Sequence, residues 1–313
     1  MFEAILGLIR SHDTVIIHRH HKPDGDAMGS QIGMKHLIKE NFPEKTVYAV
    51  GDDPRFFGFM DDSVMDEIPD SAYEGALAII LDCGSSSLIS DSRYTLAAET
   101  ARIDHHIFCE TIAGTEVIDT SFESCCGMIA QFAVESGLRL NPLAAKSLYT
   151  GIVTDSGRFR YDGTTSRTHN LVAHLLQQDF DTNQVFRNLY ADSYESKKLK
   201  AQFILKVNFT KNNVAYIYTT REEFAALGAD LFTVSRGMVN TMADIRGVDI
   251  WVNFTEAEQG VLCEIRSAAY NINPIAVKYG GGGHSKASGA TVADRETAMA
   301  MLADLDALKE ELA

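Results

Sequence analysis

Apolar residues in the first half of the chain form four short runs, and each run is followed by acidic or imidazole side chains. The runs occupy residues 15–17, 78–81, 100–103 and 151–153. A buried strand that ends in polar residues is where an open α/β sheet places its active site. We therefore expect the polar residues that follow these runs to lie close together in the folded protein.

The spacing of apolar positions predicts alternating strands and helices over residues 1–191. We expect strands at residues 14–18, 46–50, 77–81 and 101–103, and helices at 1–10, 26–41, 124–136, 142–154, 166–178 and about 182–190. Strand 77–81 is apolar throughout, as in a parallel sheet that is buried on both faces. The alternation predicts an α/β fold with a doubly wound parallel sheet.

The pattern changes after residue 191. Residues 192–202 form a charged helical stretch, which we interpret as a connector, and residues 203–313 form a second, smaller α/β domain. There we expect strands at 214–219, 248–255, 260–267 and from 287, and helices at 221–227, 233–243, 272–278 and about 295–312. A run of four glycines, followed by His284, precedes the last strand.

Composition excludes several classes of protein. The formal net charge of −15 argues against a protein that coats long or duplex nucleic acid, because phosphate affinity comes mainly from lysine and arginine. The five cysteines are odd in number and have no CxxC spacing, which indicates a reducing compartment. No apolar run approaches the roughly 18 residues of a membrane span. We therefore expect a cytoplasmic protein without a membrane partner.

The polar residues that follow the apolar runs are of the types that bind metal ions. This metal-ligand set comprises His20, Asp24, Asp26, Asp82, His105 and Asp155. Carboxylates and imidazoles without cysteine suit Mn²⁺, Mg²⁺ or Fe²⁺ better than a structural zinc ion. Each motif also has a simpler interpretation, with Asp26 as a helix N-cap and Asp82 in a turn at a strand end. The concentration of these residues in one domain favours metal binding.

Further residues are candidates for direct roles in chemistry or substrate binding. A carboxylate at Asp82 shared between two ions would allow two-metal phosphoryl chemistry, with His106 near the phosphate and Asp104 orienting an imidazole. His106 could instead be a core histidine. The glycine run lets backbone N–H groups approach a phosphate or base. The substrate-binding candidates are Arg266, Ser267, Gly282, Gly283, His284, Arg246 and Arg158.

The order of these motifs resembles the DHH family of phosphoesterases with a DHH-associated C-terminal domain, and the resemblance covers nearly the whole chain. It implies two Mn²⁺ ions in the first domain, with Mg²⁺ or another divalent ion as a substitute, and a substrate held in a cleft between the domains. One ion would be bound by His20, Asp24 and Asp82. The other would be bound by Asp26, Asp82, His105 and Asp155. The arginine, serine, glycine and histidine candidates of the second domain would hold the nucleotide.

Within the family, a chain of this length resembles the bifunctional enzymes that degrade very short RNA, about two to five nucleotides long, and convert pAp to AMP by such two-metal chemistry. The implied partners are short single-stranded RNA, pAp and dinucleotides, and a homodimer is left open. The alternatives are a linear or cyclic dinucleotide phosphodiesterase, a single-strand DNA exonuclease, a pyrophosphatase and a non-catalytic nucleotide-binding protein. Two positions depart from the family pattern: Gly127, where an acidic residue is common, and Ala268–Ala269, where Lys-Gly is common.

Overall fold

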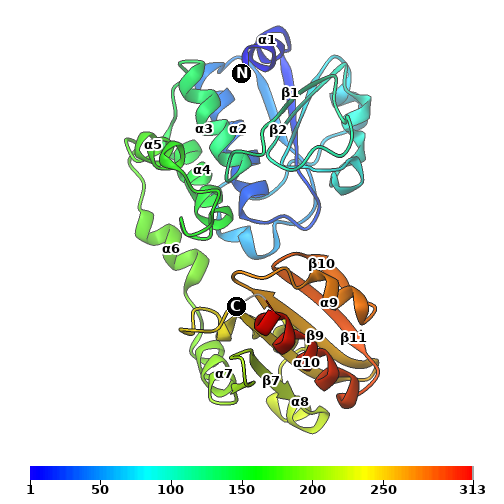
Figure 1. The fold of residues 1–313 in the computed structure, drawn as a ribbon. Helices are drawn as coiled ribbons and strands as arrows, with labels where there is room; N and C mark the ends of the chain where they lie inside the picture. The colour runs from blue at the N-terminus through cyan, green and yellow to red at the C-terminus, as the bar shows by residue number, and fades with distance from the viewer. Residues whose placement is uncertain (312–313) are drawn as a thin grey trace. The chain divides into compact units, whose positions relative to one another are not determined.

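The chain folds into two compact units, Met1–Ala191 and Asp192–Ala313, in a computed structural model that describes residues 1–311 (Figure 1). Each unit has its own sheet and its own hydrophobic core. Both are α/β units, as the alternation of apolar patterns predicts. Within the described residues, no helix combines the length and apolarity that crossing a membrane requires.

A five-stranded sheet, parallel throughout, organises the first unit. Its strands are β1 (Thr14–His18), β2 (Thr46–Ala49), β3 (Leu77–Leu81), β4 (Glu99–Asp104) and β5 (Thr115–Ile118), in the order β2-β1-β3-β4-β5. The direction of winding reverses between β1 and β3. At such a switch point the loops after the two strands diverge, which creates room for a ligand at the carboxyl ends of the strands.

Alternate residues of the central strands enter cores on opposite faces of this sheet. Val15 and Ile17 pack with the α-helices, whereas Ile16 packs on the other face with Tyr73. The helices of the unit are α1 (Glu3–Ser11), α2 (Gly25–Asn41), α3 (Cys125–Glu135), α4 (Pro142–Asp155), α5 (Ser166–Leu175) and α6 (Thr182–Tyr190). Short 3₁₀ helices and loops, rather than α-helices, cover the second face, at Asp70–Tyr73, Ser86–Leu88 and Ser92–Leu96. A further 3₁₀ helix, Arg55–Phe59, packs on the α-helical side, where Phe57 and Phe59 join Met28 and Ile32 of α2.

Helices α2 and α4 approach each other closely because small residues line their contact. A Cβ atom added at Gly29 would lie 2.5 Å from the carbonyl oxygen of Ser147, and one at Gly33 would lie 2.5 Å from the side chain of Leu148. Only glycine therefore permits this helix separation. The contact sets the first turn of α2 against the last turn of α4, where Asp155 lies.

The second unit contains a six-stranded mixed sheet in the order β10-β11-β9-β8-β7-β6. The strands are β6 (Asn208–Phe209), β7 (Ala215–Thr219), β8 (Ile250–Ala257), β9 (Gly260–Ser267), β10 (Gly282–His284) and β11 (Ala287–Val292), and only β7 and β8 pair in parallel. The helices are α7 (Tyr194–Ile204), α8 (Arg221–Leu227), α9 (Asn273–Lys278) and α10 (Arg295–Glu311). Phe203 of α7 is buried in a core of this unit, together with Trp251.

One predicted helix in the second unit is wrong. Residues 233–243 form a short π-helix, Thr233–Gly237, followed by a 3₁₀ helix, Val239–Met242. Asn253 explains the change, because its buried side-chain amide donates to the carbonyl oxygens of Val234 and Ser235, both at 2.7 Å. These hydrogen bonds give two carbonyls of the turn donors from outside the helix, which favours a departure from the regular i+4 pattern of an α-helix.

Candidate metal centre

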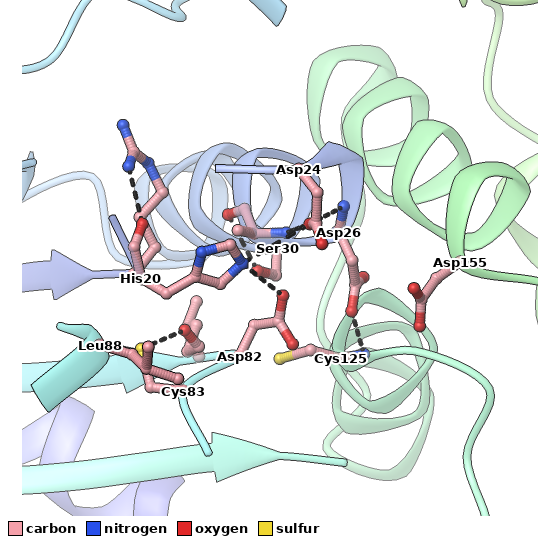
Figure 2. A network of polar contacts seen from close by, with 12 residues as sticks. His20, Asp24, Asp26, Ser30, Asp82, Cys83, Leu88, Cys125 and Asp155 are labelled. Atoms are coloured by element: carbon pink, nitrogen blue, oxygen red, sulfur yellow. Dashed lines mark hydrogen bonds and ion pairs between the residues drawn. The ribbon is translucent and has the colours of Figure 1, made fainter. Parts of the chain in front are cut away.

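The fold brings all six members of the metal-ligand set to one end of the first sheet. His20 follows β1 and Asp82 follows β3, on the two sides of the switch point. Asp24 and Asp26 stand at the start of α2, His105 follows β4 directly, and Asp155 is the last residue of α4. In Figure 2 the side chains of His20, Asp24, Asp26, Asp82 and Asp155 converge on a common region.

The first group consists of His20, Asp24 and Asp82, whose ligand atoms lie within 4.8 Å of one another. The Nε2 atom of His20 is 3.7 Å from Asp24 Oδ1 and 3.5 Å from Asp82 Oδ2. The Nδ1 atom of the same ring contacts the carbonyl oxygen of His21 at 2.9 Å. A carbonyl accepts only, so Nδ1 carries a proton and Nε2 is left to act as a ligand. Asp24 also caps α2, since Oδ1 accepts from the N–H groups of Asp26 and Ala27.

The second group consists of Asp26, His105 and Asp155. His105 Nε2 lies 3.8 Å from Asp26 Oδ2, 3.4 Å from Asp155 Oδ2 and 3.5 Å from Asp82 Oδ1. Its Nδ1 atom faces the carbonyl oxygen of Phe122 at 3.4 Å, so this imidazole also presents Nε2 to carboxylates. Asp82 therefore borders both groups, with one carboxylate oxygen toward each histidine.

The charge balance of this centre favours cations. Burial raises the pKa of Asp26 well above its usual value, and burial raises that of Asp155 to about 7. Burial lowers the pKa of His20, but the carboxylates of Asp24 and Asp82 outweigh it and raise the pKa to about 11. Asp82 Oδ1 is buried and has no hydrogen-bond partner among the described residues. A buried oxygen without a partner, facing two imidazole nitrogens, fits a divalent ion.

Asp26 is held in place by the N-terminus of α3, which lies in the helix expected at residues 124–136, although this contact was not expected. Its Oδ2 atom accepts from the backbone N–H of Cys125 at 2.6 Å, and Oδ1 accepts from that of Cys126 at 2.9 Å. These are the first two residues of α3, where N–H groups are free and the helix dipole favours an anion. The sequence signal was present in Ser124, which caps α3 through the N–H of Gly127.

His106 and Asp104 form a polar network that joins these groups, because His106, Asp82 and His105 make a third set of ligand atoms within 4.8 Å of one another. His106 Nδ1 lies 2.8 Å from Asp104 Oδ1, and this hydrogen bond is the main cause of the raised pKa of His106. Asp104 is buried, which opposes ionisation, but His106 and Arg102 together hold its pKa below the usual value. The fully buried Arg102 donates to Asp104 Oδ2 at 2.6 Å. Arg102 and Asp104 are two residues apart on β4, so their side chains share one face of the sheet.

The substrate-binding candidates of the second unit gather at one corner of its sheet. His284, Ala287, Arg266 and Trp251 are in register across four strands, so His284 and Arg266 share a face. Ser267 closes the turn after β9, where its Oγ atom accepts from the N–H of Tyr270 at 2.7 Å.

Glycine has a structural role at two positions of the glycine run. A Cβ atom at Gly281 would lie 2.1 Å from the carbonyl oxygen of Gly289, and one at Gly283 would lie 2.6 Å from that of Ala287. The run therefore allows β10 to pack against β11. This close packing was not expected from the sequence, which suggested only an approach to phosphate.

Three other positions singled out from the sequence lie apart from these clusters. Arg246 is exposed in the turn before β8. Arg158 belongs to the first unit, three residues after Asp155, and its guanidinium lies 4.9 Å from the ring centre of Tyr190. At Gly127 an added Cβ would lie 2.3 Å from Glu123 Oε1, so a buried carboxylate from the preceding turn already occupies that space.

Comparison with known proteins identifies the class that this fold and this centre define. Residues 14–152 match the DHH family, N-terminal domain, and residues 232–311 match the DHHA1 domain. The chain belongs to the DHH family.

Similar curated proteins extend over almost the whole chain. The bifunctional oligoribonuclease and PAP phosphatase NrnA of Bacillus subtilis is 34% identical over 314 residues, which cover 99% of each protein. A probable NrnA from Streptococcus mutans is 36% identical and covers 92% of this chain and 93% of its own length. An exopolyphosphatase-related protein from Bacteroides fragilis has a similar solved structure, with a TM-score of 0.84, 23% identity and coverage of 99% and 96%. At that identity the likeness concerns the fold alone.

Proposed function

We propose that this protein is a phosphoesterase that hydrolyses RNA of about two to five nucleotides to mononucleotides and dephosphorylates pAp to AMP, with two divalent ions, Mn²⁺ foremost. The observation that carries the proposal is the complete ligand set, in a chain similar over its full length to relatives named for both activities. His20, Asp24 and Asp82 would hold one ion. Asp26, His105 and Asp155 would hold the other with Asp82 between them.

Two bound ions would supply a nucleophile at neutral pH and neutralise charge on the phosphate. The residues of the chain hold the ligand side chains in position and supply a proton to the leaving group. The Cys125 and Cys126 N–H groups fix the Asp26 carboxylate, and the backbone carbonyls of His21 and Phe122 orient the two imidazoles. His106, whose Nδ1 is bound to Asp104, has a half-exposed side chain, and its raised pKa suits a proton donor to the leaving oxygen.

One assay series tests the proposal. Labelled RNAs from two to 24 nucleotides and pAp are incubated with Mn²⁺ or with EDTA, and the products are separated by length. We expect mononucleotides from the shortest RNAs and AMP from pAp in Mn²⁺, with neither in EDTA. A protein that binds these molecules without turning any of them over would contradict the proposal.

We further propose that Arg266, Ser267, Gly282, Gly283 and His284 bind the nucleotide, and Arg246 and Arg158 are secondary candidates. Arg266→Ala and His284→Ala are expected to raise KM for pAp about tenfold or more, because each removes a donor to phosphate or base. Mn²⁺ binding, followed by calorimetry, should stay unchanged. Arg221→Ala, an exposed arginine paired with Glu258, is the matched control. An unchanged KM in both variants would refute this assignment.

A further inference from the structure

Two loops beside the metal centre expose apolar side chains that the proposed chemistry does not use. Ile107 and Phe108, directly after His106, are 79% and 56% exposed. Leu88, in the loop after β3, is 41% exposed. The two loops, residues 84–90 and 105–114, contain no lysine or arginine. Apart from His105 and His106, they therefore border the candidate metal centre without positive side chains.

Hydrogen bonds hold the two loops together. The Glu110 carboxylate accepts from the N–H and Oγ of Ser86, at 2.8 and 3.0 Å, and from the Oγ of Ser85 at 2.9 Å. The buried Arg102 donates to the backbone oxygen of Glu110 at 3.0 Å, while it also holds Asp104. The segment with Ile107 and Phe108 is thus anchored at both ends, so its apolar side chains are presented without a large ordering cost.

The anchored segment lies close to the reacting groups. The Cα atom of Phe108 is at most about 7 Å from that of His106, because only two peptide links separate them. His106 Nδ1 is itself 3.6 Å from Asp82 Oδ1. On the other side, the Leu88 carbonyl accepts from the N–H of His21 at 2.8 Å, next to the metal-ligand His20. Apolar side chains therefore flank the centre near both of its histidine-bearing loops.

The chemistry of this apolar rim suits a nucleobase. Bases offer flat apolar faces, and their stacking on aromatic rings is strong and tolerant of sequence. A chain with a net charge of −15 gains little from general attraction to phosphate, so base contacts add affinity beyond that of the ions and of the proposed donors Arg266 and His284. We propose that Phe108, with Ile107 beside it, stacks against a base adjacent to the scissile phosphate and makes the site selective for oligonucleotides. This inference rests on the proposed function.

A double-mutant cycle, which combines variants of Phe108 with substrates that lack a base, tests the stack. The substrates are pApA and two analogues of it, each with one of the two adenines replaced by an abasic residue. Phe108→Ala should raise KM for pApA about tenfold, with kcat unchanged. For the analogue that lacks the stacked base, wild type and variant should have equal KM, because the partner is already missing. Phe108→Trp should retain the wild-type KM, and Phe209→Ala, at 51% exposure on β6, should change nothing.

The outcomes separate this inference from the proposed function. If Phe108→Ala leaves KM for pApA unchanged, or raises it equally for both abasic analogues, no base stacks there. A fall in kcat alone would mean that Phe108 only supports His106, which also overturns the stack. If the wild type does not hydrolyse pApA, the proposed function fails. The stack is then tested by calorimetry alone: equal affinity of pApA for wild type and Phe108→Ala would overturn it.

Discussion

At the scale of single residues, Asp82 combines an unusual backbone with a central position. Its φ of 56° lies in the left-handed region, which aspartate and asparagine tolerate better than most side chains. The turn directs one carboxylate oxygen to His20 and the other to His105, each at 3.5 Å. The sequence could single out Asp82 as a candidate ligand because it follows an apolar strand. The turn that aims it between two histidines depends on tertiary contacts, which the sequence pattern does not report.

Asp82→Asn keeps the shape and the backbone preference of this residue and removes only its charge. We expect kcat to fall about a thousandfold or more, because the shared carboxylate would no longer hold both ions. The variant should fold with an unchanged circular dichroism spectrum, and calorimetry should find Mn²⁺ affinity at least about tenfold weaker. Hydrolysis at the wild-type rate would contradict a shared carboxylate.

The buried Arg19 is a second residue whose charge needs a partner. It is fully buried and donates to Asp52 Oδ1 at 2.7 Å. Asp52→Ala would leave this cation without its carboxylate partner. We expect the free energy of unfolding to fall by about 2–3 kcal/mol, which is less than for a fully buried pair because Asp52 is partly exposed. Urea titrations at neutral pH measure this loss. The exposed Asp13→Asn should stay within about 0.5 kcal/mol of wild type.

The same ion pair has a defined pH dependence. Burial raises the pKa of Asp52, but hydrogen bonds from the Lys22 N–H and the Arg19 guanidinium outweigh it and lower the pKa to about 2. An aspartate in the unfolded chain titrates near pH 3.9. The stabilisation is therefore complete above about pH 4 and is lost as the pH falls toward 2. The stability difference between wild type and Asp52→Asn should shrink over that interval.

At the scale of elements, strands with an apolar run or a clear alternation were predictable, and strands without either pattern were not. The runs at 14–18 and 77–81 match β1 and β3 because every residue there, or nearly so, is buried. β5 has four half-buried residues at the sheet edge, and β10 consists of two glycines and a histidine, so neither carries an apolar pattern. The π-helix depends on Asn253, a residue distant in sequence, which no local periodicity could reveal.

The close contact between α2 and α4 sets the distance between the candidate ligands Asp26 and Asp155. Gly29→Ala would put a Cβ atom 2.5 Å from the Ser147 carbonyl and 2.9 Å from Cys126 Sγ, which forces the helices apart. We expect a loss of about 2 kcal/mol or more in stability and weaker Mn²⁺ binding, since Asp26 and Asp155 would separate. Gly7→Ala, at an open position of α1, should instead stabilise by about 0.5–1 kcal/mol. Equal effects at both positions would contradict this role of Gly29.

At the scale of the whole molecule, the metal centre belongs to the first unit and the single tryptophan to the second. All six metal-ligand residues precede Ala191, whereas Trp251 is buried in the second unit. Ions that bind only the folded state stabilise it by mass action. Tryptophan fluorescence therefore follows the second unit, whereas circular dichroism follows both units.

Mn²⁺ at about 100 times its dissociation constant should stabilise the first unit by about 2.7 kcal/mol for each bound ion. We expect the circular dichroism transition to move to higher temperature in Mn²⁺ and to return after EDTA. The same addition should stabilise Asp82→Asn less, by no more than about 1.4 kcal/mol for each ion if its affinity is tenfold weaker. If Mn²⁺ does not change the transition temperature of the wild type, ion binding by the folded first unit is contradicted.

The metal ligands are widely separated along the chain, and this has a consequence for synthesis. Asp24 and Asp26 leave the ribosome early, Asp82 and His105 follow, and Asp155 comes much later. At about 5–20 residues per second, the interval from first to last ligand is on the order of ten seconds. Throughout that time the ligand set is incomplete. Under the proposed two-ion assignment, the ion held by Asp26, His105 and Asp155 could bind tightly only after α4 has emerged and packed against α2.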